Sequence, residues 1–137
     1  EAAKGRQIFF QEGVQCARCH RINGEGTDFG PDLSHVAQKY GRSQILENIL
    51  FPSKTIEPNF ISYQVETKDE LSYSGFILAR SAEEVVLKDP NAKEVRLRAS
   101  EVKSVQAQSI SVMPELLLQS LTVQNVADLL EYLSSLH

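Results

Sequence analysis

The spacing of apolar and polar residues changes twice along the chain. Helical spacing governs the first part, where Ile8 and Phe9 lie on one apolar face and Gly13 is placed to stop the helix. The glycine-rich stretch 24–33 predicts a loop. The helices expected in this part are 2–12, 34–40, and a third that begins behind a Ser43 cap and ends at Pro52.

Alternation of side chains between two faces replaces helical spacing at Phe60 and predicts β-strands. Between two of these strands, the stretch DPNAK at 89–93 predicts a hairpin turn. The expected strands are 60–67, 71–79, 85–88, 95–98 and 102–105, which together predict a small antiparallel sheet or barrel.

Helical spacing returns at Pro114, a residue suited to the first turn of a helix. Thr122 is expected to cap a final amphipathic helix, whose apolar stripe is Val126, Leu129, Leu130 and Leu133, with Tyr132 beside it. Gly5 and Phe9 of the first helix are expected to face Tyr132 and Leu129 where the two helices cross. The order of helices, strands and helices predicts an α+β chain.

Composition narrows the classes of function. The chain has 137 residues, of which 42% are hydrophobic and 23% charged, as in an ordinary globular domain. No apolar run approaches the roughly 20 residues of a membrane span. The net charge is −4 and the basic residues are scattered, so nucleic acid is not an expected partner. Without an initiator methionine or signal peptide, we expect a processed protein or a domain of a longer one.

The stretch CARCH holds the only two cysteines, Cys16 and Cys19, directly before His20. A zinc site would need two further ligands without the usual spacing, and a redox dithiol would normally follow a strand in a βαβ unit. Covalent haem attachment uses all three residues, since two thiols can bind the two vinyl groups while the histidine reaches the iron. These three interpretations stay open on the motif alone.

Other residues could complete a haem pocket. Met113 is the only methionine and is a candidate second axial ligand, although a lone methionine can also be core filler. In the stretch GPDL, the Pro31 carbonyl could accept a hydrogen bond from Nδ1 of His20, and Leu33 could contact the porphyrin. Taken by itself, this stretch is an ordinary proline turn.

In this order, CARCH, GPDL, the methionine–proline pair and the terminal helix VADLLEYLSSL resemble the class I c-type cytochromes. The resemblance covers 1–59 and 108–137 and implies one covalent haem c, with His20 as proximal and Met113 as distal ligand. It also implies a mainly helical fold around the haem. The β-rich part 60–107 is absent from a minimal cytochrome and is similar to an insertion in haem-binding domains of the planctomycete and verrucomicrobial type. We therefore expect one domain of three parts: 1–59, 60–107 and 108–137.

The resemblance implies a one-electron carrier rather than an enzyme, exported or periplasmic, that acts with a redox partner protein or a neighbouring domain of a longer chain. Two alternatives remain. The first is a haem enzyme or gas sensor with an open distal site, for which His35 could serve, although a solvent-facing histidine is the simpler interpretation. The second is a binding module built on the strand edges of 60–107.

Overall fold

The computed structural model describes residues 1–137, which form two compact units. The helical unit consists of Glu1–Thr55 and Pro114–His137, and the β unit of Ile56–Met113 lies between them in sequence. The structure thus divides the chain after Thr55 and after Met113, close to the expected part boundaries at 59 and 107. None of the helices combines the length and apolar character needed to span a membrane.

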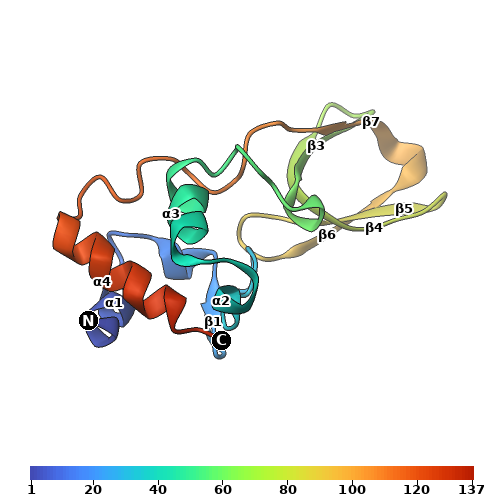
Figure 1. The fold of residues 1–137 in the computed structure, drawn as a ribbon. Coiled ribbons are helices and arrows are strands. Elements are labelled where there is room, and N and C mark those ends of the chain that lie inside the picture. Colours follow the sequence, from blue (N-terminus) through green and yellow to red (C-terminus); the bar gives the residue numbers. More distant parts are fainter. The chain divides into compact units, whose positions relative to one another are not determined.

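The helical unit contains four α-helices, one 3₁₀ turn and a two-stranded hairpin (Figure 1). In chain order these elements are α1 (Ala2–Phe9), η1 (Cys16–Arg18), β1 (Arg21–Ile22), β2 (Glu25–Gly26), α2 (Val36–Lys39), α3 (Arg42–Leu50) and α4 (Val123–Ser134). The expected crossing of the first and last helices is confirmed, because α1 packs against α4. The rings of Phe9 and Tyr132 meet edge to face, with 6.3 Å between their centroids.

One apolar core holds this unit together. Its buried members come from α1, the segment that follows it, β1, α3, α4 and the end of the chain: Ile8, Phe9, Val14, Ile22, Ile45, Leu129, Leu130, Tyr132, Leu133 and Leu136. The expected cap of α4 is confirmed, since the Thr122 hydroxyl accepts from the backbone N–H of Asn125 at 3.1 Å and the Asn125 side chain accepts from the N–H of Thr122. The apolar stripe of α4 also faces the core as its sequence predicts, because Leu129, Leu130 and Leu133 are buried in it.

Three expectations for the helices are wrong. Helix α1 ends at Phe9 rather than 12. The N–H of Gln11 donates to the carbonyl of Ile8, and the N–H of Val14 donates to the carbonyl of Gln11, so tight turns replace the helix before Gly13 is reached. Helix α3 begins at Arg42 with Gly41 as its cap, so Ser43 lies inside the first turn. No helix begins at Pro114: Leu116 takes a left-handed conformation with φ 64°, which a right-handed helix cannot include.

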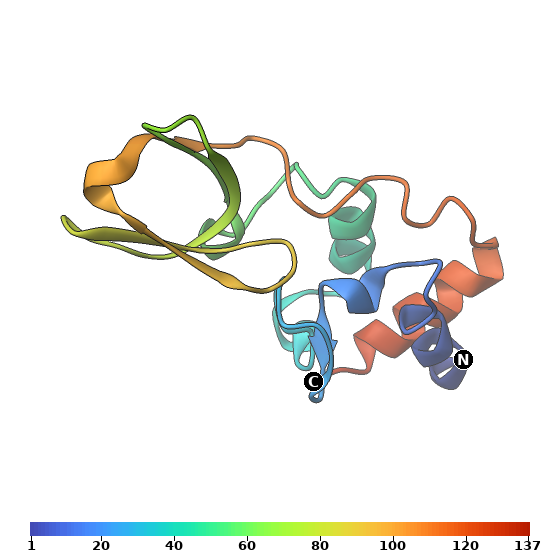
Figure 2. The same ribbon diagram turned by 180° about the vertical axis from the view of Figure 1, so that it is seen from behind.

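The β unit is a five-stranded antiparallel sheet, as the alternating pattern predicts, and its strand order is β6-β5-β4-β3-β7. Its strands are β3 (Ser62–Thr67), β4 (Ser72–Arg80), β5 (Glu84–Lys88), β6 (Glu94–Arg98) and β7 (Val102–Ala107), with short 3₁₀ turns η2 (Pro58–Phe60) and η3 (Ala99–Glu101). The sheet is strongly curved (Figure 2). It encloses its own core of Val65, Val85, Leu87 and Leu97.

Candidate functional site

The two cysteines and His20 lie together in one tight turn of the helical unit. The turn η1 follows α1, after Gln15, whose backbone is left-handed with φ 70°. The carbonyl of Cys16 then accepts from the backbone N–H groups of Cys19 at 3.2 Å and His20 at 3.0 Å. These two bonds close the CxxCH segment on itself, so that both sulfurs and the imidazole belong to a single local structure.

Both thiols are free and half-buried. Burial raises the pKa of Cys16 to about 11 and also raises the pKa of Cys19, against which the neighbouring Arg18 charge acts. Thiolates, the form that attacks disulfides, are therefore disfavoured at neutral pH. Neither alternative finds support elsewhere: no group of three or more metal-binding side chains exists, and the motif follows a helix rather than a strand.

The imidazole of His20 is held by a single hydrogen bond. Its Nδ1 lies 2.7 Å from the backbone oxygen of Pro31. Because a carbonyl oxygen can only accept, Nδ1 carries the proton and Nε2 keeps its lone pair. Burial lowers the pKa of His20, while the bond to Pro31 acts in the opposite direction. His20 is thus a neutral imidazole with Nε2 available to a metal, and the bond expected from the GPDL stretch is present.

The hairpin β1–β2, directly after His20, was not expected. Its turn is Asn23–Gly24, with φ of 50° and 85°, so the two residues share the left-handed backbone of a two-residue hairpin turn. The residue pair Asn-Gly was the signal in the sequence for this hairpin. Gly26 then passes so close to His20 that a Cβ atom would lie 2.2 Å from the His20 backbone oxygen. The hairpin therefore fixes the backbone of the histidine itself.

The remaining expected site residues lie in different units. Leu33 is half-buried and packs against the helical core, and its N–H donates to the carbonyl of Arg21 at 2.9 Å. Met113 is half-buried and is the last residue of the β unit. The structure therefore brings Cys16, Cys19, His20, Pro31 and Leu33 into one unit, and Met113 precedes that unit's second segment in the chain.

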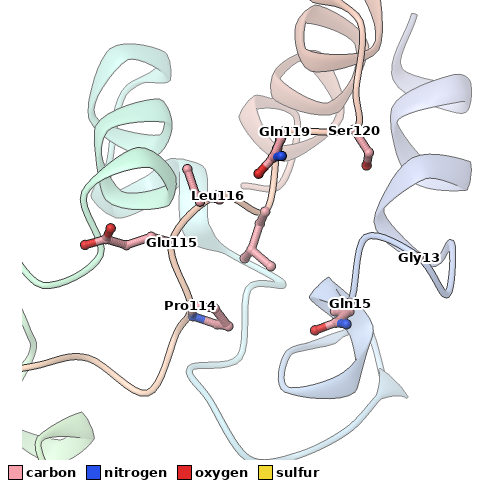
Figure 3. Close-up of a pocket in the computed structure, with 8 residues that line it drawn as sticks. Gly13, Gln15, Pro114, Glu115, Leu116, Gln119 and Ser120 are labelled. Atoms are coloured by element: carbon pink, nitrogen blue, oxygen red, sulfur yellow. The ribbon is translucent and has the colours of Figure 1, made fainter.

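A cavity of about 440 Å³ lies within the helical unit (Figure 3). Gly13 and Gln15 line it from the segment that leads into Cys16, and the opposite wall is formed by Pro114–Leu117, Gln119 and Ser120, the segment that follows Met113. Figure 3 shows Pro114 and Gln15 facing each other across it. It is widely open to solvent, and none of the expected haem-site residues lines it.

His35 does not contribute to this site. It is exposed, precedes α2, and its Nδ1 lies 2.9 Å from the backbone oxygen of His137. The structure therefore agrees with the simpler interpretation of a surface histidine.

The residues around His20 fit a covalently attached haem. The thiols are not joined in a disulfide and are thus available for thioether formation, and Nε2 of His20 is left without a hydrogen-bond partner. The hydrogen bond from Nδ1 to the Pro31 carbonyl supplies the orientation that a histidine ligand needs.

A comparison with protein families agrees with this geometry. Residues 2–73, more than half of the chain, match the sequence model of the family described as cytochrome c. A search of curated proteins finds no match. The matched span contains Cys16, Cys19, His20 and the GPDL stretch, and it ends before Met113. The chain therefore belongs to the cytochrome c family, whose members carry covalently attached haem c and generally transfer electrons rather than catalyse reactions.

Proposed function

We propose that this chain is a monohaem c-type cytochrome that transfers single electrons, and that His20 and Met113 would hold the haem iron. When bound, the haem supplies a one-electron couple between ferric and ferrous iron. The observation that carries the proposal is the 2.7 Å hydrogen bond from Nδ1 of His20 to Pro31, because it leaves Nε2 as the ligand atom and fixes the ring.

Met113 is proposed as the second ligand for two reasons. It is the only methionine, and a thioether is a common partner of histidine in electron-carrying haem sites. It also directly precedes Pro114, which lines the cavity beside the segment leading into Cys16. The other candidate from the sequence, His35, is exposed and bonded to the His137 carbonyl, so a distal site built on His35 has no support.

The setting of this activity is proposed from the family. Cytochrome c domains are typically exported, and we propose a periplasmic or otherwise exported location. We also propose that the chain relays electrons to a redox partner protein or a neighbouring domain, as in larger proteins that carry the haem-binding domain with a similar insertion. The β unit has its own core and two edge strands, β6 and β7, which could take part in such a contact.

The test is the visible and near-infrared spectrum of the purified protein, ferric and ferrous, with and without carbon monoxide. A low-spin haem c spectrum with the ferric methionine–iron charge-transfer band, unaltered by carbon monoxide, is expected. A high-spin spectrum that shifts with carbon monoxide would overturn the proposal in favour of an enzyme or sensor with an open iron.

Two variants separate the roles of the residues. Met113→Ala is expected to keep the haem attached, lose the charge-transfer band and bind carbon monoxide, whereas the control Val112→Ala, a half-buried neighbour, should retain the band. Cys19→Ala is expected to reduce covalent attachment, measured as haem that acidified acetone extracts. An unchanged band in Met113→Ala would reject Met113 as a ligand.

A further inference from the structure

The segment that carries Pro31 is tied to the segment that carries His20 by a series of hydrogen bonds. The bonds run from one end of the contact to the other: Phe29 N–H to Cys19 O at 3.2 Å, Gly30 N–H to Cys19 O at 2.6 Å, His20 Nδ1 to Pro31 O at 2.7 Å, Leu33 N–H to Arg21 O at 2.9 Å, and Asn23 N–H to Ser34 Oγ at 2.7 Å. The last of these is the only one made to a side-chain oxygen.

Ser34 is itself held by Asp32. The backbone N–H of Ser34 donates to Oδ1 of Asp32 at 2.8 Å. Hydrogen bonds from the Ser34 hydroxyl and backbone lower the pKa of Asp32, and the charges of Arg21 and His35 act in the same direction. Asp32 is therefore an anion at neutral pH, and its carboxylate holds the backbone of Ser34, whose hydroxyl accepts from Asn23.

Asn23, which donates to the Ser34 hydroxyl, is also held in place. Asn23 has a left-handed backbone with φ 50° in the hairpin turn, so the direction of its N–H is fixed by that turn. Ser34 thus joins a rigid hairpin to the GPDL stretch, because its hydroxyl accepts from Asn23 on one side and its backbone N–H donates to Asp32 on the other. An alanine at this position would keep the backbone N–H that donates to Asp32 but could not accept from Asn23.

We propose that Ser34 and Asp32 are positioning residues that set the register of 30–34 along the His20 segment, and thereby the strength of the hydrogen bond from His20 to Pro31. A stronger bond at Nδ1 makes the imidazole a better electron donor at Nε2, which favours ferric iron and lowers the reduction potential. Ser34 and Asp32 would therefore tune the potential from outside the haem pocket. This inference rests on the proposed function, because it requires His20 to ligate the iron.

The experiment compares the holoprotein with its Ser34→Ala, Ser34→Thr and Asp32→Asn variants, and with Ser100→Ala as an exposed control in η3. The first readout is the reduction potential. The second is the exchange rate of the His20 Nδ1 proton in the ferrous protein, measured by nuclear magnetic resonance. A role in stability alone would leave the reduction potential of the folded protein unchanged, and would speed the exchange of protected backbone amides elsewhere in the helical unit as much as that of Nδ1.

We expect Ser34→Ala to raise the potential and to speed exchange of the Nδ1 proton about tenfold, the factor that corresponds to the loss of about one ordinary hydrogen bond. Ser34→Thr keeps the hydroxyl and should restore both values, and Ser100→Ala should match the wild type. Asp32→Asn, which keeps an acceptor for the Ser34 N–H but loses the charge, should shift both readouts less and in the same direction. It provides the test if Ser34→Ala does not fold.

An unchanged exchange rate and an unchanged potential in Ser34→Ala would overturn the inference and leave the proposed function intact. If Ser34→Ala does not fold, the same result in Asp32→Asn would overturn it. Failure of the proposed function is a separate result, since the wild type itself would then lack the low-spin spectrum of a histidine-ligated haem.

Discussion

Gly30 lies directly against the imidazole ring of His20. A Cβ atom at this position would be 3.1 Å from Cε1 and 3.2 Å from Nδ1 of the ring, and 3.3 Å from the carbonyl oxygen of Cys19. These distances are shorter than ordinary van der Waals contact, so the ring or the backbone would have to move by a few tenths of an ångström. The backbone φ of Gly30 is not left-handed, so the glycine is not needed for its backbone conformation. It is needed because the backbone passes so close to the His20 ring.

The first prediction concerns this contact. Gly30→Ala should retain haem but push the His20 ring away from Pro31, with a loss of stability of about 1–3 kcal/mol, as expected for overpacking. The reduction potential should shift in the same variant. Gly41→Ala is the matched control, since no atom lies within 4 Å of the Cβ position at Gly41. Equal potentials in Gly30→Ala and Gly41→Ala would contradict the prediction.

The second prediction concerns the crossing of α1 and α4. A Cβ atom at Gly5 would lie 1.9 Å from the backbone oxygen of Asp128 and 2.7 Å from Cβ of Tyr132. Backbone atoms cannot yield as the end of a flexible side chain can, so the two helices would have to separate. Gly5→Ala should therefore destabilise the holoprotein by about 3 kcal/mol or more, although alanine is the better helix former.

Thermal unfolding followed by far-ultraviolet circular dichroism measures this effect. Gly13→Ala is the control, because nothing lies within 4 Å of its Cβ position, and its stability should stay within about 0.5 kcal/mol of the wild type. The close crossing would not be a constraint on the fold if both variants unfolded at the same temperature.

The sequence predicts the parts of the site that depend on local spacing. CARCH places three reactive groups within one turn, and GPDL offers a carbonyl for His20 whether or not the rest of the fold is known. The stripe of α4 and the cap at Thr122 were also predictable, because period and capping chemistry act within a few residues. In the same way, alternation predicted all five strands of the β unit.

Features that depend on a single backbone angle were missed. The left-handed conformation of Leu116 has no signal in a stretch whose apolar residues suit a helix, so the expected helix at Pro114 is wrong. The hairpin at Asn23–Gly24 was hidden in a glycine-rich stretch that also suits a loop. Ser34 was missed because its role depends on contacts with Asn23 and Asp32, and spacing alone does not reveal such a network.

The third prediction concerns the core of the β unit. Leu87 is fully buried with Val65, Val85 and Leu97, so Leu87→Ala should cost about 2–5 kcal/mol of stability. Leu78 in the adjacent strand is 49% exposed, and Leu78→Ala should change stability by no more than about 0.5 kcal/mol. Hydrogen exchange measured by mass spectrometry can follow peptides of 62–107 separately. Similar protection of these peptides in the two variants would show that Leu87 is not central to the core.

The fourth prediction concerns the pH dependence of Asp32. Its pKa is lowered from 3.8, first by the hydroxyl and backbone of Ser34, with smaller contributions from the charges of Arg21 and His35. Because the folded state binds the proton less tightly than the unfolded state, the charged carboxylate stabilises the fold. This contribution is complete above pH 3.8 and is lost as the pH falls through the lower pKa of the folded state.

Asp32→Asn removes this charge without removing an acceptor for the Ser34 N–H. The free energy of unfolding of the variant should therefore fall below that of the wild type at neutral pH, by a small amount because Asp32 is exposed. The difference should shrink as the pH drops below 3.8, where the wild-type carboxyl also becomes neutral. Urea unfolding at a series of pH values measures it, and comparing the two proteins cancels the acid titration of all shared groups. A difference that stayed constant from neutral to acid pH would assign the effect to packing rather than charge.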